Sequence, residues 1–312
     1  MALLSLVAVL LLEQIRPLPY RWVVYEPLSK LARVLESFFN AGERKHGVVA
    51  WLIAAGGLVV VAGAVYAALH ALNPLLGWLW NVLVLYLTMG FRQFSHYYTD
   101  IQMALRMEDV PHARELLGEW RGRPADGLSS SDIARLAIEE ALGASHRHVF
   151  GVIVCFVLLP GPCGAVLYRV AAFLADFWGR RTAMESGDFG TFSRQAFAVI
   201  DWLPLRATAA AFAVVGNFED AVYCWRTQAA RWAGGDSAGG LGVVLASGAG
   251  ALGVRLGMPV MELGEISDRA EIGLGEEADV DFMQSAVGLV WRALLLCLLL
   301  LLLVSIAGLV GR

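Results

Sequence analysis

The fold is decided by a stretch of 45 residues, 47–91, that reads GVVAWLIAAGGLVVVAGAVYAALHALNPLLGWLWNVLVLYLTMGF and holds no Asp, Glu, Lys or Arg. A membrane helix needs about 20 apolar residues to cross the bilayer core, so this stretch is long enough for two spans. Asn73 and Pro74 interrupt it and supply a turn. The sequence therefore predicts a helical hairpin in a membrane, with spans at 48–72 and 75–91.

The composition of the whole chain agrees with a membrane protein. Of its 312 residues, 58% are hydrophobic and 17% are charged, whereas soluble domains have roughly 45–50% apolar and 25% charged residues. A second uncharged run, at 293–311, is rich in leucine and predicts a further span at 286–311. We therefore expect an all-α, polytopic membrane protein, and the composition argues against a soluble globular enzyme.

Three shorter apolar runs have more than one interpretation. Residues 2–15 lack the charged start and the small-residue cleavage site of a signal peptide, so we interpret them as an uncleaved membrane-embedded or interfacial helix. Residues 148–175 contain Pro160 and Pro162, which break a helix. This run either re-enters the membrane or crosses it as a kinked helix. Residues 203–215 are too few to span the bilayer and predict an interfacial helix.

Basic residues predict which side of the membrane the connecting segments face. The segments before and after the 47–91 hairpin each carry at least six Lys or Arg residues, and a hairpin places both on one side. The positive-inside rule makes that side cytoplasmic. We expect a multi-pass protein of the bacterial inner membrane that forms one domain over 1–312. Residues 92–147 and 176–285 are expected to form mostly cytoplasmic or interfacial helices and loops.

The remaining charges are distributed unevenly along the chain. Residues 262–281 hold eight Asp or Glu residues and one basic residue, Arg269, so they predict an acidic linker before the last span. The basic residues elsewhere are not interleaved with aromatic residues, and nucleic-acid binding is therefore not expected. The four cysteines form no Cys-x-x-Cys pair, so we interpret them as small apolar residues.

Motifs of common enzyme classes give little support for a cofactor. Residues 248–253 fit the string Gly-x-Gly-x-x-Gly, but the strand–helix–strand unit with a closing acidic residue that a dinucleotide site requires does not follow. We interpret these small residues as sites of close helix packing. The sequence has no P-loop, kinase, serine-hydrolase or zinc-protease signature, and no cofactor is expected.

The first candidate site lies at the end of the second predicted span. Arg92, His96 and Asp100 follow one another at positions i, i+4 and i+8, so on a helix they share one face. Polar groups close to membrane depth often serve a function. A helix face that is simply solvated or ion-paired explains the same spacing, and the sequence does not separate the two interpretations.

The second cluster is His146-Arg147-His148, which follows Glu139 on an expected helix. His146 and His148 have the spacing of a zinc-binding pair, but no third ligand at a telling distance accompanies them. We therefore favour a basic anchor at the lipid headgroups. A metal site would require His96 or Glu139 to converge on the pair in space.

The third cluster is the string Asp201-Trp202-Leu203-Pro204-Leu205-Arg206. Its acidic and basic ends flank a Trp-Pro turn at the expected membrane surface, where they can pair with each other or hold a phosphate-bearing ligand. Together the three clusters predict a pocket for an anionic ligand at the inner leaflet. Its candidate residues are Arg92, His96, Asp100, Glu139, His146, Arg147, Asp201 and Arg206.

Several short motifs follow one another between residues 92 and 257. They are Ala113-Arg114, Gly122-Arg123, Ala137-Ile138-Glu139, GPCGAVLYR ending at Arg169, DWLPLR ending at Arg206, and AGALGVRLG ending at Gly257. This ordered set resembles the CobD/CbiB family, the membrane enzymes of cobalamin biosynthesis that attach aminopropanol or its phosphate to adenosylcobyric acid. The resemblance covers roughly half of the chain and implies a corrinoid substrate.

The chain also departs from that family pattern. Pro124 follows Gly122-Arg123 where the family has Asp, and residues 171–174 replace an Asn-Thr-x-Asp motif. The chain resembles AmpE in these losses, in its N-terminal apolar run ending at Glu13 and in its Gly-x-x-Glu string at 216–219. AmpE is an inner-membrane protein linked to control of β-lactamase expression and to peptidoglycan-recycling signals.

Two functions therefore compete, and the sequence leaves open whether the protein is an enzyme. The first, which we favour, is an AmpE-like signalling modulator that binds an anionic small ligand at the cytoplasmic membrane face. The alternative is an adenosylcobinamide-phosphate synthase that uses His96 or Glu139 as the base in amide formation. A purely structural membrane protein is a third class. The expected partners are the lipid bilayer, an anionic ligand or cobalamin precursor, and a second copy of the chain or another protein.

Overall fold

The computed structural model describes residues 2–15, 18, 20–40, 43–179, 188–232, 240–262, 265–267 and 269–310. Within these ranges the chain is helical almost throughout, and its strands are two or three residues long. Four helices are long and apolar enough to cross a membrane, namely Arg44–Leu72, Ser130–Leu158, Thr191–Val215 and Val280–Gly308. The predicted all-α, polytopic membrane fold is confirmed.

The chain divides into two compact units, and each unit is assembled from two separate stretches of sequence. Unit 1 consists of Met1–Phe91 and Arg147–Pro204. Unit 2 consists of Arg92–His146 and Leu205–Arg312. Each core is therefore built from helices that lie far apart along the chain.

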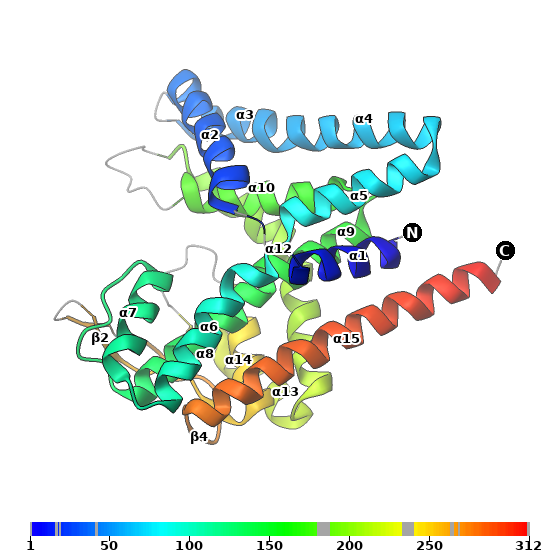
Figure 1. The fold of residues 1–312 in the computed structure, drawn as a ribbon. Coiled ribbons are helices and arrows are strands. Elements are labelled where there is room, and N and C mark those ends of the chain that lie inside the picture. Colours follow the sequence, from blue (N-terminus) through cyan, green and yellow to red (C-terminus); the bar gives the residue numbers. More distant parts are fainter. Residues whose placement is uncertain are drawn as a thin grey trace. The chain divides into compact units, whose positions relative to one another are not determined.

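In unit 1 the uncharged stretch folds into a helical hairpin (Figure 1). Its first arm is continuous from α3 (Arg44–Trp51) through the π-helical segment η2 (Leu52–Gly56) to α4 (Gly57–Leu72). Its second arm is α5 (Pro74–Thr88), which packs against α4. With 15 residues, α5 is shorter than the about 20 residues that a straight span needs, so a second span in this hairpin remains a prediction.

Local side-chain chemistry builds the turn between the two arms. The Asn73 side-chain oxygen accepts a hydrogen bond from the Leu75 amide at 2.8 Å, and Pro74 occupies the first turn of α5. Both are preferred features of a helix start. The Trp80 indole then donates to the Ala62 carbonyl oxygen at 3.1 Å and ties the second arm to the first. The turn predicted at this position is therefore present.

The N-terminal helices complete this side of unit 1. Helix α1 (Ala2–Ile15) packs against α5, and near its end the Glu13 carboxylate accepts a hydrogen bond from the Phe91 amide at 3.2 Å. The π-helical segment η1 (Arg21–Tyr25) leads into α2 (Glu26–Phe39), which packs against α3 and α10. The apolar run at 2–15 is thus one helix that ends beside a buried carboxylate.

The run at 148–175 is broken as its prolines predict. Helix α9 (Gly151–Leu158) ends before the turn, α10 (Cys163–Phe177) begins after it, and the two pack against each other. Gly161 in the turn has φ +60°, a conformation that favours glycine. Gly164 allows close backbone approach, because a Cβ atom there would lie 1.8 Å from the Cys155 carbonyl oxygen.

Helices α6 (Phe91–Arg106), α7 (Val110–Arg121) and α8 (Ser130–Ser145) form the first part of unit 2. A capping box starts α8, in which the Ser129 and Asp132 side chains each accept from the other's backbone amide. The chain continues from α8 through η3 (His146–Phe150) into α9 of unit 1.

Two later helices of unit 2 pack closely through small residues. They are α13 (Phe218–Gln228) and α14 (Leu241–Leu252), and α14 contains most of the Gly-x-Gly-x-x-Gly string. A Cβ atom at Gly250 would lie 2.5 Å from the Asp220 carbonyl oxygen, and one at Gly248 would lie 2.8 Å from the Leu142 side chain. The string is therefore a helix-packing surface, as predicted.

The short strands lie between residues 254 and 277, a stretch that overlaps the acidic segment 262–281. Strand β1 (Val254–Arg255) pairs in parallel with β4 (Glu276–Glu277), and β2 (Val260–Glu262) pairs antiparallel with β3 (Glu265–Ser267). Helix α15 (Val280–Val310) follows and packs on α8. The Tyr98 hydroxyl of α6 donates to a carbonyl oxygen of α15 at 2.8 Å, and burial raises the pKa of Tyr98, so this donor keeps its proton.

Gly164→Ala tests the close approach of α9 and α10. The added methyl group collides with the backbone of α9, and overpacking of this kind costs about 1–3 kcal/mol. We expect a lower thermal midpoint in detergent, measured by loss of the monodisperse peak in size-exclusion chromatography. The matched control is Gly57→Ala, because a Cβ atom at Gly57 meets nothing within 4 Å. Equal midpoints for the two variants would contradict the packing described.

Candidate functional site

A buried polar cluster lies in unit 1, where η3, α9, α10 and α12 (Thr191–Val215) contribute side chains. The Tyr168 hydroxyl of α10 donates to the Asp201 carboxylate of α12 at 2.9 Å, and both side chains are buried. The ring of Tyr168 also packs against Phe197, with centroids 5.6 Å apart. Gly151 of α9 gives the tyrosine its space, because a Cβ atom there would lie 2.2 Å from the Tyr168 hydroxyl oxygen. These contacts fix one carboxylate inside an apolar helix bundle.

Two arginines join this cluster around one imidazole. Arg147 and Arg169 both interact electrostatically with His148. The guanidinium of Arg169 lies 4.6 Å from the ring centroid of Tyr20, a favourable cation–π arrangement. Arg147 approaches the Asp176 carboxylate at 3.9 Å. The cluster therefore brings cationic donors from η3 and α10 together with carboxylates on α10 and α12.

Some of these donors lack an acceptor among the described residues. Arg169 is 7% exposed, and its buried Nε atom has no hydrogen-bond partner within the part of the chain that the structure describes. Nδ1 of His148, which donates or accepts according to its tautomer, is also buried without a partner among those residues. A buried donor without an acceptor costs free energy, and guanidinium groups bind carboxylate or phosphate oxygens well. The cluster is therefore suited to hold an anionic group of a ligand.

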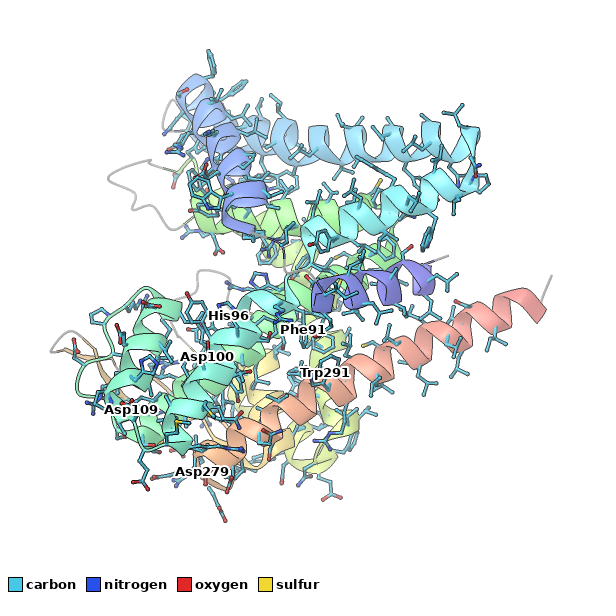
Figure 2. All side chains as sticks on the ribbon, viewed as in Figure 1. Phe91, His96, Asp100, Asp109, Asp279 and Trp291 are labelled. Carbon is cyan, nitrogen blue, oxygen red and sulfur yellow. The ribbon has the colours of Figure 1, made fainter. Side chains whose placement is uncertain are left out.

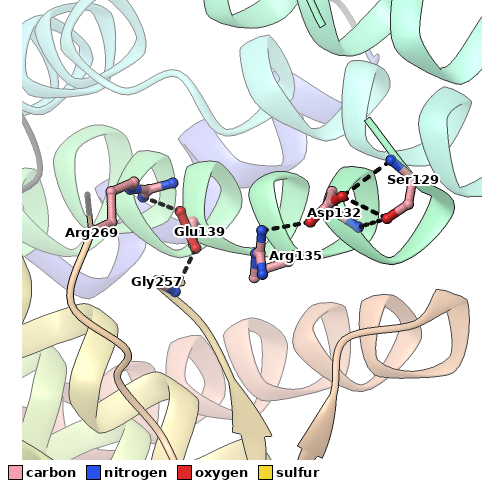
Figure 3. Close-up of polar contacts among 6 residues, drawn as sticks. All are labelled: Ser129, Asp132, Arg135, Glu139, Gly257 and Arg269. Carbon is pink, nitrogen blue, oxygen red and sulfur yellow. Dashed lines mark hydrogen bonds and ion pairs between the residues drawn. The ribbon is translucent and has the colours of Figure 1, made fainter. Parts of the chain in front are cut away.

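Unit 2 contains a second buried carboxylate, on α8. Glu139 is 5% exposed; one of its oxygens accepts from the Gly257 amide at 2.8 Å and the other accepts from the Arg269 guanidinium (Figure 3). Arg269 also lies 4.7 Å from the ring of Trp232. One turn earlier, Arg135 donates to Asp132 at 2.6 Å, as the same figure shows. Glu139 thus binds the segment that carries the short strands at two points, Gly257 and Arg269.

This arrangement limits what Glu139 does chemically. Each oxygen of Glu139 already accepts one hydrogen bond and the side chain is buried, so a substrate proton has no direct access to it in this arrangement. Gly257 has φ +90°, and a Cβ atom there would lie 2.1 Å from the Ala270 carbonyl oxygen, so only glycine fits at this point of attachment. In this structure Glu139 therefore anchors the segment between Gly257 and Arg269 to α8.

The predicted row of Arg92, His96 and Asp100 lies along α6. His96 and Asp100 are both exposed, and Figure 2 labels them on this helix. Nδ1 of His96 lies 3.0 Å from the Arg92 carbonyl oxygen, and its ring contacts Tyr97 with centroids 4.3 Å apart. The three residues do share one helix face, as their spacing predicts, and that face is open within unit 2.

The remaining candidates fall into both units. His146 is fully buried in unit 2, where its Nδ1 lies 2.9 Å from the Thr208 hydroxyl oxygen, and Arg206 lies on the same helix as Thr208. Arg147 and Asp201 belong to the unit 1 cluster. Among the residues placed in the structure, no group of three or more His, Cys, Asp or Glu side chains is arranged to hold a metal ion.

Several residues of the two buried centres were not among the sequence candidates. Tyr168 and Arg169 end the motif GPCGAVLYR, and Gly257 ends the motif AGALGVRLG, so the family-like strings already contained them. Arg269 had a different signal, because it is the one basic residue in the acidic segment 262–281. What the sequence could not give was the pairing of these residues with Asp201 and Glu139 across more than 30 positions.

Comparison with known proteins gives a consistent result. The family model described as CobD/Cbib protein matches residues 6–290. The cobalamin biosynthesis protein CobD of Stutzerimonas stutzeri is 34% identical over 303 residues, which cover 96% of each chain. CobD of Chromobacterium violaceum is 31% identical with 91% of each chain covered, and CbiB of Salmonella typhimurium is 26% identical with 91% of this chain and 90% of its own covered. No solved structure matches significantly.

Arg269→Ala tests how much the ion pair between Arg269 and Glu139 stabilises unit 2. Removing the guanidinium leaves a buried carboxylate uncompensated, which typically costs about 3–5 kcal/mol. We expect a clear fall in thermal midpoint and faster proteolysis within residues 254–277. The double variant Glu139→Gln with Arg269→Ala is expected to recover part of this loss, because the buried charge is removed. Arg255→Ala serves as the control, since its pairs with Glu271 and Glu277 are partly exposed and span 3.7 and 3.8 Å. An Arg255 variant as unstable as the Arg269 variant would contradict this account.

Proposed function

The chain belongs to the CobD/CbiB protein family, and on that basis we propose that it is a membrane enzyme of cobalamin biosynthesis, an adenosylcobinamide-phosphate synthase. Such an enzyme joins a corrinoid carboxyl group to the amine of aminopropanol or its phosphate through an amide bond. The single observation that carries the proposal is the family match over residues 6–290, which spans both compact units.

The AmpE-like signalling role that the sequence favours first receives no support from the relatives of this chain. The similar proteins of Stutzerimonas stutzeri, Chromobacterium violaceum and Salmonella typhimurium are all named as cobalamin biosynthesis proteins, and they match over nearly the whole chain. The alternative function therefore becomes the main one. The buried polar cluster of unit 1 fits that role, because both the corrinoid carboxylate and a phosphorylated amine are anions.

Amide formation has several chemical requirements, and some of them can be assigned to residues of this chain. The amine nitrogen must lose a proton before it attacks the acyl carbon, and the oxygen leaving group must depart from that carbon. Because a free carboxylate is a poor acyl donor, an activated acyl group or a nucleoside triphosphate has to supply the driving force. We assign Arg147 and Arg169 to hold an anionic substrate group, since guanidinium groups orient carboxylates and phosphates.

A base is required for the amine proton, and the two predicted bases differ in this structure. Glu139 has both oxygens engaged, whereas His96 is exposed on α6. The choice between these two bases stays a prediction.

The proposed setting is the bacterial inner membrane. Four candidate spans support a multi-pass membrane protein. With the second crossing predicted for the 47–91 hairpin, the arginine-rich segments on either side of it share one face, which the positive-inside rule makes cytoplasmic. The substrates are soluble cytoplasmic molecules in this proposal, and the corrinoid is a substrate of the protein. No resident cofactor forms part of the proposal.

Complementation tests the proposed function. The gene is expressed in a strain that lacks its CbiB synthase, on medium where growth depends on completed cobalamin. We expect growth to be restored, with the protein detected in the membrane fraction. Membrane-inserted protein that leaves the strain unable to grow would contradict the synthase proposal, and so would growth that depends only on added cobinamide.

Arg169→Ala tests the assigned anion site within the same assay. Loss of one charge-assisted hydrogen bond of about 1.5–3 kcal/mol predicts a fall in activity of roughly 10- to 100-fold. Arg169→Lys should recover only part of it, because lysine lacks the planar fork of donors. Arg106→Ala, on the exposed end of α6, is the control with the same loss of charge. Full activity of the Arg169→Ala variant at normal protein level would remove this residue from the site.

A further inference from the structure

Helix α2 presents three different faces around its circumference. Ser29, Ala32, Leu35 and Glu36 are buried, and this face packs against α3 and α10 within unit 1. Most of the remaining circumference is open. At 100° per residue the open side divides into an apolar half and a basic half, which lie next to each other.

The apolar half is a continuous stripe along the helix. Pro27, Leu31, Val34 and Phe38 follow at spacings of four, three and four residues, so their side chains stack on one face. Phe38 is 80% exposed and Val34 is 50% exposed. Exposed apolar side chains in such a row mark an interaction surface when they are contiguous.

The basic half runs beside this stripe. Lys30, Arg33 and Ser37 occupy it and are exposed, and the half-buried carboxylate of Glu26 lies on the same side, one turn before Lys30. The Arg33 side chain donates to the Ser29 carbonyl oxygen at 3.2 Å, which holds the guanidinium along the edge of the helix. Immediately before α2, the π-helical segment η1 adds Trp22, which is 69% exposed. Tryptophan and basic residues are enriched where proteins meet the lipid headgroups.

The position of α2 relative to its own span limits where it can lie. Helix α2 ends at Phe39, and only residues 40–43 separate it from the candidate span Arg44–Leu72, which starts with two basic residues. A linker of this length reaches at most about 18 Å, so α2 cannot be far from the membrane surface. Figure 1 shows α2 crossing the direction of α3 and α4 steeply, and all three helices belong to unit 1. A helix that runs across the axis of a spanning helix, and not along it, lies along the membrane plane.

We propose that α2 is an interfacial helix that binds the surface of a bilayer containing anionic phospholipids. Its stripe of Pro27, Leu31, Val34 and Phe38 enters the boundary between headgroups and acyl chains, and Lys30 and Arg33 contact the phosphates. A second copy of the chain fits this face less well. A two-fold contact through one narrow stripe would bring Lys30 and Arg33 against their own counterparts.

Nitroxide labels on single cysteines test this placement in the full-length protein. Cys155, Cys163, Cys224 and Cys297 are replaced by alanine, and Val34→Cys, Phe38→Cys and Ser37→Cys are labelled separately and reconstituted into phosphatidylcholine bilayers with phosphatidylglycerol. We expect collision with a water-soluble nickel reagent to be several-fold lower at 34 and 38 than at 37, and collision with oxygen, which partitions into the bilayer, to be higher. Labelled variants are used only if they remain monodisperse.

Two results would overturn the proposal. If positions 34 and 38 collide with the nickel reagent as often as position 37, the stripe faces water. If they are protected from both the nickel reagent and oxygen, another protein surface or a second copy covers the stripe.

The anionic part of the proposal has its own matched variants. Lys30→Gln with Arg33→Gln is compared with Arg106→Gln and Arg226→Gln, two exposed arginines of unit 2. Both double variants lose the same charge. We expect the protection at Phe38→Cys to increase when phosphatidylglycerol is added, and this increase to disappear only in the α2 variant. An increase that is unchanged in the α2 variant, or lost in both, would refute the headgroup contact.

Discussion

A charge on an apolar helix has to meet a partner, because an uncompensated charge in a low-dielectric surrounding costs several kcal/mol. This constraint accounts for much of the structure. Glu139 lies on the candidate span Ser130–Leu158 and takes both a guanidinium and a backbone amide. Asp201 lies on the candidate span Thr191–Val215 and takes the Tyr168 hydroxyl. Each pairing joins segments that are distant in sequence, so the few buried charges specify the tertiary contacts of their unit.

The backbone meets a related constraint. Helices that carry buried polar groups must pack closely enough to exclude voids, and glycine allows this where two chains meet. Gly164 lets α10 approach the carbonyl groups of α9, Gly151 makes room for the ring of Tyr168, and Gly250 brings α14 against α13. In this way Gly151 and Gly164 allow the polar side chains of the unit 1 cluster to reach hydrogen-bond distance.

The parts of the fold that follow from local patterns could be predicted from the sequence. The uncharged run at 47–91, the turn at Asn73 and the break at Pro160 are consequences of hydropathy, capping and proline geometry, and the structure contains all three. The i, i+4, i+8 row on α6 is also a local pattern. The buried centres are different, because the pairs Tyr168 with Asp201 and Glu139 with Arg269 depend on how helices pack. No spacing rule relates positions 33 or 130 residues apart.

The most direct test of the synthase function is an assay of the purified protein in lipid nanodiscs. The protein is incubated with adenosylcobyric acid and aminopropanol or its phosphate, with and without ATP, and the products are identified by mass spectrometry. We expect a corrinoid whose mass has increased by the amine minus one water, and loss of this product in the Arg169→Ala variant. A folded, monodisperse protein that leaves the corrinoid mass unchanged under every one of these conditions would contradict it.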